Sequence, residues 1–222
     1  MMVALECNKK RIVVSRQYLI LPRPATTMPR TAADYTFFWS TNHRMGISMV
    51  QAPFTTTVHI DGVDQDVTFL SNEHWMMLQK ALLFSDHDVA RKVLSIDGTS
   101  KSDMARVKAL GRRVKHFEED VWVQHRERIV LEGTVHKFRQ NDALREKLFA
   151  TGDTTVVEAS PFDKIWGIGC SEANAISRGG NKWGLNLLGK ALGEARRILR
   201  EEERERTKTP EPGRRRWIRD GL

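Results

Sequence analysis

The stretch 71–84 shows a hydrophobic pattern typical of a helix that is buried on nearly all sides. Ser71, at its start, has the side chain of an N-cap residue, which accepts a hydrogen bond from the first turn. At about 100° per residue, one side of this helix is apolar and the opposite side mixes charged with apolar groups. The apolar side consists of Trp75, Leu78 and Leu82, and the mixed side consists of Glu73, Met77, Lys80 and Phe84.

Glu73 and Lys80 therefore place a carboxylate and an amine two turns apart on one face of a buried helix. Burying a charge costs free energy unless the charge is paired or used in chemistry. Two interpretations follow. Either the two groups form an internal ion pair or reach water at the rim of the core, or they belong to an acid/base or nucleophilic site.

Shorter patterns along the chain predict the other elements. β-Branched residues on both sides of Asp61-Gly62 predict a hairpin over 54–69, and Gly152 stands where a C-cap glycine belongs. The folded part begins at Phe37 in this interpretation. We expect helices over 87–95, 102–114, 118–138, 142–150 and from 183 to about 200, a strand over 155–158 and a mobile loop over 171–182. Together these elements predict an α+β fold, a mainly helical single domain with a small antiparallel β-sheet.

The loop over 160–169 carries more chemistry than a connector needs. It contains Asp163, Trp166, Gly167 and Gly169. Glycine lets a backbone approach a ligand closely, and tryptophan offers a face for stacking. A tight turn around a packed Trp166 is the alternative interpretation of the same residues.

The last predicted helix starts with Gly184 and Asn186. Backbone N–H groups at a helix start are free to hold an anion such as a phosphate, and these two residues are suited to presenting them. Glycine and asparagine also cap many helices, so a capping role is the alternative.

The net charge of +8 is concentrated at the two ends of the 222-residue chain. Residues 1–30 hold six lysines and arginines against one acid, and residues 204–222 hold seven against three. We therefore predict a disordered basic extension over 1–30, a nearly neutral domain over 31–203 and a charged tail over 204–222. Solvated tails are one interpretation, and non-specific binding of polyanions is the other.

The cysteines, Cys7 and Cys170, lie far apart in unlike surroundings, which favours a reduced, intracellular protein and excludes a cysteine-built zinc site. No apolar run approaches the about 20 residues of a membrane span, so we expect no membrane partner. The sequence has no dinucleotide-binding glycine motif, P-loop, HExxH pair or GxSxG elbow. We expect no metal and no cofactor, and we place the protein in the cytoplasm, with the mitochondrion or the nucleus as alternatives.

A set of ordered motifs resembles the NADAR superfamily, which is named for NAD and ADP-ribose and includes the bacterial YbiA-like N-glycosidases. The resemblance runs from about Phe37 to Arg200. The residues that carry it are Glu73-His74-x5-Lys80-Ala81, Leu110-Gly-Arg112, Trp122, Phe138, Asp163-x2-Trp166-Gly167 and Gly184-x-Asn186-x-Leu188-Gly189-Lys190-Ala191-Leu192.

The resemblance implies an N-glycosidase. Some members of the family cleave phosphoribosylamine intermediates of riboflavin synthesis, and others remove ADP-ribose from guanine bases. The family's active-site residues carry over to Glu73, Lys80, Trp122, Asp163 and Trp166. The chain departs from the family pattern at Ser48-Met49-Val50, a segment that helps to line the substrate pocket in such proteins.

The chemistry of N-glycoside cleavage fits these residue types. The reaction passes through an oxocarbenium-like ribosyl centre and needs a carboxylate near C1′, a proton for the leaving base and a nucleophile. Lys80 beside Met77, Ala81 and Phe84 would have a lowered pKa, and its attack on the sugar would give a ring-opened imine, a route attributed to part of the family. We expect Glu73, Lys80 and Asp163 to be catalytic, and Arg112, Trp122, Trp166, Gly167, Gly184 and Asn186 to bind substrate.

Three functions remain open from the sequence. The first is removal of ADP-ribose from guanine, and the second is cleavage of phosphoribosylamino-pyrimidine intermediates of riboflavin synthesis. The third is a module that binds ADP-ribose without turnover, although such a reader would need neither Lys80 nor a matched pair of carboxylates. The expected partner is a nucleotide or ADP-ribosyl substrate, with ADP-ribosylated nucleic acid as an alternative.

Overall fold

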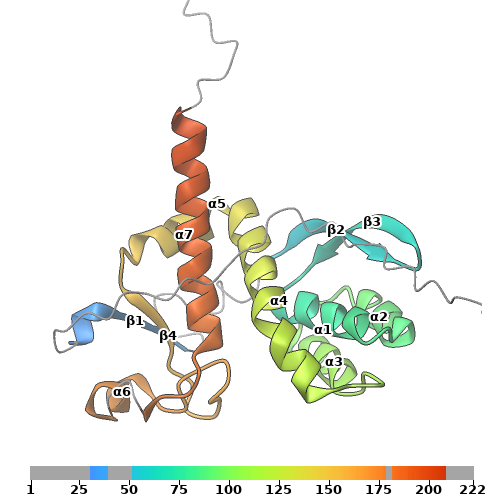
Figure 1. Ribbon diagram of the computed structural model, residues 1–222, viewed down its shortest axis with the longest axis horizontal. Helices are drawn as coiled ribbons and strands as arrows, with labels where there is room; N and C mark the ends of the chain where they lie inside the picture. Colours follow the sequence, from blue (N-terminus) through green and yellow to red (C-terminus); the bar gives the residue numbers. More distant parts are fainter. Residues whose placement is uncertain (1–30, 40–51, 179–181, 209–222) are drawn as a thin grey trace, which may run out of the picture.

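A long central helix, α4 (Glu119–Gln140), separates the molecule into two halves (Figure 1). The computed structural model describes residues 31–39, 52–178 and 182–208. Some of the predictions made from the sequence concern residues outside this set. These are residues 1–30, Ser48–Val50 and the last 14 residues of the chain. One half holds β2 (Phe54–Ile60), β3 (Val63–Phe69), α1 (Asn72–Leu83), α2 (His87–Leu94) and α3 (Lys101–Gly111). The other half holds β1 (Tyr35–Phe38), α5 (Asp142–Ala150), β4 (Thr155–Glu158), α6 (Glu172–Arg178) and α7 (Leu187–Lys208).

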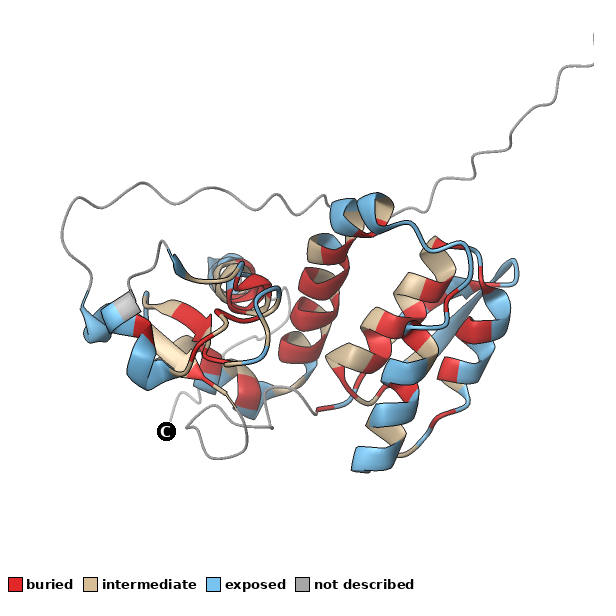
Figure 2. Ribbon diagram, turned by 90° about the horizontal axis from the view of Figure 1, so that it is seen from below, coloured by how far each residue is buried: buried red, intermediate tan, exposed pale blue. Residues whose placement is uncertain are grey.

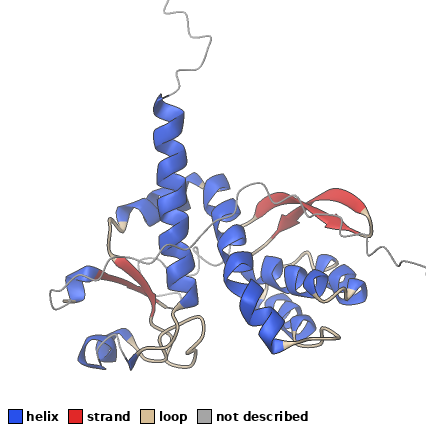
Figure 3. Cartoon of the chain, in the orientation of Figure 1, coloured by secondary structure: helices blue, strands red, loops and turns tan. Residues whose placement is uncertain are grey.

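The strands form two separate two-stranded sheets (Figure 3). β2 and β3 form the predicted antiparallel hairpin, and Asp61 and Gly62 both have the positive φ that a tight hairpin turn requires. β1 pairs in parallel with β4, from Tyr35 opposite Thr155 to Phe38 opposite Glu158. The α+β class and the antiparallel sheet are confirmed, whereas the parallel pair was not predicted.

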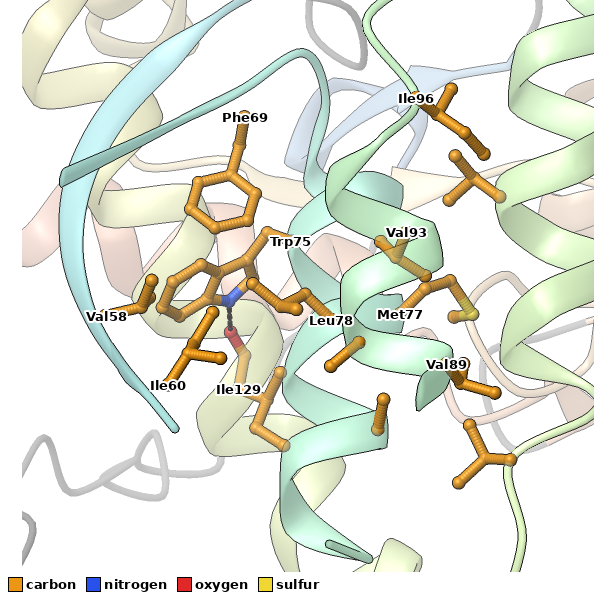
Figure 4. Close-up of a cluster of buried hydrophobic side chains, with 14 of the residues drawn as sticks. Val58, Ile60, Phe69, Trp75, Met77, Leu78, Val89, Val93, Ile96 and Ile129 are labelled. Carbon is orange, nitrogen blue, oxygen red and sulfur yellow. Dashed lines mark hydrogen bonds between the residues drawn. The ribbon is translucent and has the colours of Figure 1, made fainter. Parts of the chain in front are cut away.

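The predicted buried helix is α1, and its N-cap is confirmed because Ser71 accepts a hydrogen bond from the His74 N–H. Trp75 lies in the middle of the first hydrophobic cluster and donates from Nε1 to the Ile129 carbonyl oxygen at 2.7 Å (Figure 4). Leu78 is fully buried beside it. The indole ring therefore joins α1 to α4 by both apolar contact and a satisfied polar group.

The opposite face of α4 packs against α7. Leu131, Val135 and Phe138 of α4 lie in one hydrophobic cluster with Leu192 and Leu199 of α7. Figure 2 shows buried positions, in red, on the inner sides of the packed elements and exposed positions, in pale blue, on the outside. The central helix is thus apolar on two sides, and the two halves share it as a common wall.

The helices predicted over 87–95, 118–138 and 142–150 are confirmed within two residues at each end, and the helix predicted over 102–114 ends early, at Gly111. The mobile loop predicted over 171–182 is wrong for residues 172–178, which form α6, and residues 179–181 lie outside the described residues. Its Ala175 is fully buried and accepts a hydrogen bond from Trp183 Nε1, so a tertiary contact orders this polar segment.

α7 starts later and ends later than expected. It begins at Leu187 and continues to Lys208, so the boundary predicted between residues 203 and 204 falls inside a helix. Arg197 bridges Glu194 and Glu201 along this helix, which supports the exposed turns beyond the core. No helix within the described residues is long and apolar enough to cross a bilayer.

Candidate active site

Lys80 lies under a partial aromatic enclosure on the mixed face of α1. Its Nζ is 3.9 Å from the centroid of the Phe117 ring and 5.5 Å from that of Trp122. Burial lowers the pKa of the Lys80 amine, and the negative charge of Glu119 partly opposes this shift. This lowering of the Lys80 pKa is in the direction that the sequence predicted. The two aromatic rings beside the amine, however, come from the start of α4 and from the segment before it.

The segment that carries Phe117 is fastened to the end of α1 by a buried carboxylate. Asp86, the N-cap of α2, accepts hydrogen bonds from the N–H groups of Val89 and Lys115 at 3.1 and 2.9 Å. The bond from Lys115 contributes most to lowering the pKa of Asp86. Phe117 follows two residues later, and its ring packs edge-on against Phe84, so its place over Lys80 is fixed.

Glu73 does not form the internal ion pair with Lys80 that the helical pattern allowed. Its Oε1 lies 3.3 Å from Nζ of Lys108 on α3. The carboxylate on the same helix face is therefore held by an amine from another helix, and Glu119 is the acid that acts on the amine of Lys80.

Asp163 organises the loop that follows β4. Its Oδ1 accepts hydrogen bonds from the N–H groups of Ile165 and Trp166, both at 2.8 Å. Trp166, so positioned, packs against the hydrophobic cluster that contains Trp122. The two tryptophans predicted to bind substrate thus lie at the same hydrophobic cluster, Trp122 on the central helix α4 and Trp166 in the loop that follows β4.

Glu158, at the end of β4, is a further carboxyl group that the sequence analysis missed. Burial, together with the nearby Asp163, raises the pKa of Glu158 to about 7, and Lys108 acts in the opposite direction. Since Lys108 also pairs with Glu73, these four residues form one charged cluster. The signal in the sequence was an acid at the end of a short strand, directly before the loop with Asp163.

The backbone donors of Gly184 and Asn186 are not free, so the expectation that they present N–H groups to a phosphate is wrong. They donate to the carbonyl oxygens of Ile168 and Gly167 at 2.9 and 3.2 Å. Asn186 also uses its side chain, which accepts from the Glu158 N–H and donates to the Val156 carbonyl oxygen, both at 3.0 Å. Its positive φ, which asparagine tolerates better than most residues, allows this arrangement.

The glycines of the two motifs have a packing reason as well. A Cβ on Gly167 would lie 2.8 Å from the Glu158 carbonyl oxygen, and one on Gly184 would lie 2.7 Å from the Gly167 carbonyl oxygen. Both are needed where two backbone segments touch. Arg112, at the C-cap of α3, is exposed. Contact of Arg112, Gly167, Gly184 and Asn186 with substrate stays a prediction.

Comparisons with known proteins agree with this fold. The NADAR domain model matches residues 37–200. N-glycosidase R617 of Acanthamoeba polyphaga mimivirus is 40% identical over 162 residues, 71% of this chain and 92% of that protein. Riboflavin biosynthesis protein VVA0006 of Vibrio vulnificus is 32% identical over 131 residues, 59% of this chain but only 31% of that protein. The NMR structure of the E. coli protein YbiA matches with a TM-score of 0.56 and 26% identity, over 77% of this chain and 88% of that one. The chain belongs to the NADAR domain family.

Proposed function

We propose that this protein is an N-glycosidase that hydrolyses the bond between a phosphoribose or ADP-ribose and a nucleobase-like amine, for example ADP-ribose on guanine. Family membership and the N-glycosidase relative support the reaction class. The observation that carries the mechanism is the environment of the Lys80 amine. The amine lies beside two aromatic rings, and burial lowers its pKa.

Lys80 is the nucleophile in this proposal. Only the neutral amine has a lone pair for attack on C1′, and desolvation increases the neutral fraction near pH 7. The aromatic faces and Glu119 favour the ammonium form instead, so the amine keeps access to both protonation states. A bond from Nζ to C1′ replaces the bond to the base, the ribosyl ring opens to an imine, and water then releases the sugar.

The charged cluster supplies the acids that an oxocarbenium-like centre requires. Asp163 and Glu73 stabilise the positive charge that develops at the sugar, and Lys108 holds Glu73 at 3.3 Å. Trp122 and Trp166 offer faces on which the base stacks. Arg112 lies at the exposed end of α3, where a substrate phosphate would meet a cation.

The second candidate substrate is a phosphoribosylamino-pyrimidine. The relative named as a riboflavin biosynthesis protein supports it, although the match covers less than a third of that protein. A reader of ADP-ribose without turnover is disfavoured by Lys80, because a binding site gains nothing from a desolvated amine with a lowered pKa.

The test is incubation of the full chain with ADP-ribosylated guanosine and, separately, with a phosphoribosylaminopyrimidine, followed by mass analysis of the released base. Borohydride added during turnover should reduce the imine and leave a stable mass increment on the peptide that contains Lys80. Release of base without any trapped adduct would remove Lys80 from the nucleophile's role. Calorimetric binding of ADP-ribose without release from either substrate would favour the reader.

A further inference from the structure

The carboxyl group of Glu158, in the charged cluster, has one oxygen without a hydrogen-bond partner among the described residues. Its backbone is fixed on both sides, because its N–H donates to Asn186 Oδ1 at 3.0 Å and its carbonyl oxygen accepts from the Ile168 N–H at 2.9 Å. Its Oε2 is buried, and within the described residues it has no hydrogen-bond partner. A buried oxygen without a partner is costly, and a substrate that supplies one would remove that cost.

The other acids near the site are already engaged. Glu73 is paired with Lys108, and Asp163 uses Oδ1 to accept two N–H groups of its own loop. Glu119 is 63% exposed and contacts Arg126 at 3.9 Å. Among the acids described around Lys80 and the Asp163 loop, Glu158 therefore has the carboxyl oxygen that is both buried and unpartnered.

We propose that Glu158 is the residue that gives a proton to the departing base. The inference rests on the proposed N-glycosidase function. As the C1′–N bond breaks, its electron pair passes to the nitrogen of the base, which takes the proton of the Glu158 carboxyl while Lys80 Nζ bonds to C1′. When water later adds to C1′ and releases Lys80, one proton of that water returns to the Glu158 carboxylate.

The electrostatics of the cluster agree with this division of work. Burial and Asp163 raise the pKa of Glu158 to about 7, so a large share of the group carries its proton near neutral pH. One carboxyl with a proton beside others engaged in pairing or loop hydrogen bonds is the arrangement that acid catalysis requires. Asn186 and the backbone of Ile168 act as positioning groups, because they fix the strand end from which Glu158 extends.

A direct titration tests the proton independently of any substrate. The side-chain carbonyl carbon of Glu158, followed by NMR in labelled full-length protein, should titrate near pH 7 rather than near the ordinary value of 4.5. Asp163→Asn should lower this pKa and Lys108→Met should raise it, because the two charges act on Glu158 with opposite signs. Titration near 4.5, or no response to either variant, would overturn the proposal.

A kinetic test uses the release of base in a single turnover. Glu158→Gln keeps the shape of the side chain, and we expect it to slow release by at least ~100-fold. The wild-type rate should fall as pH rises through about 7, where Glu158 loses its proton, and this fall should be absent in Glu158→Gln. Unchanged release, or slow release that keeps the same fall with pH, would contradict proton donation by Glu158.

The alanine variant separates loss of the donor from loss of the fold. Glu158→Ala leaves space for a small acid, so added formic or acetic acid should restore part of the release rate, and the melting temperature reports folding. Failure of the wild type to release any base would refute the proposed N-glycosidase function instead. The NMR titration still decides whether Glu158 holds a proton in that case.

Discussion

Two lysines of this chain lie in apolar surroundings, and their neighbours differ. Lys80 lies on α1 beside two aromatic rings, with Glu119 acting on its charge. Lys137 lies within α4, is 0% exposed, and its Nζ has no hydrogen-bond partner among the described residues. Burial lowers the pKa of both amines, that of Lys137 to about 7. A low pKa alone therefore does not identify a catalytic lysine, and the surrounding groups have to be considered.

We therefore expect substitutions of the two lysines to have different effects. The largest effect expected is the loss of turnover on substitution of Lys80. Lys80→Arg keeps a positive charge but removes the nucleophilic amine, so we expect a loss of at least ~1000-fold in kcat and no borohydride labelling. Lys137→Met is the matched control and should keep kcat within a few-fold. Activity in Lys80→Arg, or its loss in a folded Lys137→Met variant, would reverse the assignment of the two amines.

Substitution of the two carboxylates proposed to act with Lys80 should have the next largest effect on turnover. Asp163→Asn and Glu73→Gln each remove a charge and keep the side-chain shape, and we expect each to reduce kcat by at least ~100-fold. The amide oxygen introduced by Asp163→Asn would still accept the two hydrogen bonds that hold Trp166 and its loop, so the melting temperature should change little. A variant that unfolds readily but keeps its specific activity would indicate that its carboxylate is only structural.

Substitution of Lys137 should change the stability of the fold rather than turnover. The unfolded chain binds a proton at Lys137 up to about pH 10.5 and the folded chain only up to about 7, so stability rises with pH between these values. Lys137→Met should remove this rise and, at pH 7 and below, add on the order of a few kcal/mol to the free energy of unfolding. Urea unfolding at pH 6, 8 and 10 measures both. A wild-type stability that does not rise over this range would contradict burial of the unpaired amine.

The smallest effect concerns the charge beside Lys80. Because Glu119 raises the pKa of Lys80, Glu119→Gln should lower that pKa further. The acidic limb of kcat/KM should then move to lower pH, since more of the amine is neutral at any given pH. Asp88→Asn, on an exposed part of α2, is a suitable control. An acidic limb that does not move would show that Glu119 does not act on the nucleophile, and a shift to higher pH would contradict the expected sign.

Local patterns predicted the hairpin and α1 because each is specified by neighbouring residues. The Asp61-Gly62 turn sets the register of its two strands, and the helical spacing around Trp75 sets the buried face of α1. β1 and β4 are four residues each, and nothing within Tyr35–Phe38 indicates that its partner lies 120 positions later. Pairing over such a distance depends on the packing of the whole domain.

The candidate site divides in the same way. Lys80 and Glu73 were found because they interrupt an apolar helix, whereas Phe117 and Glu158 stand in stretches with no such contrast. Their importance arises only where distant segments meet. Gly184 and Asn186 were misinterpreted because a glycine and an asparagine before a helix suit two different roles. They suit an anion site, and they also suit a backbone clamp, by which we mean a set of hydrogen bonds from the backbone N–H groups of one segment to the carbonyl oxygens of another. The second role can be recognised only when the partner segment is known.

That clamp limits how the site can move. Five successive N–H groups, from Gly184 to Leu188, donate to the carbonyl oxygens of residues 164–168, which follow Asp163. Each such bond contributes about 1 kcal/mol, so lifting this loop would require most of a local unfolding event rather than a hinge motion. Substrate and product therefore have to exchange on the turnover timescale while this wall of the site stays in place.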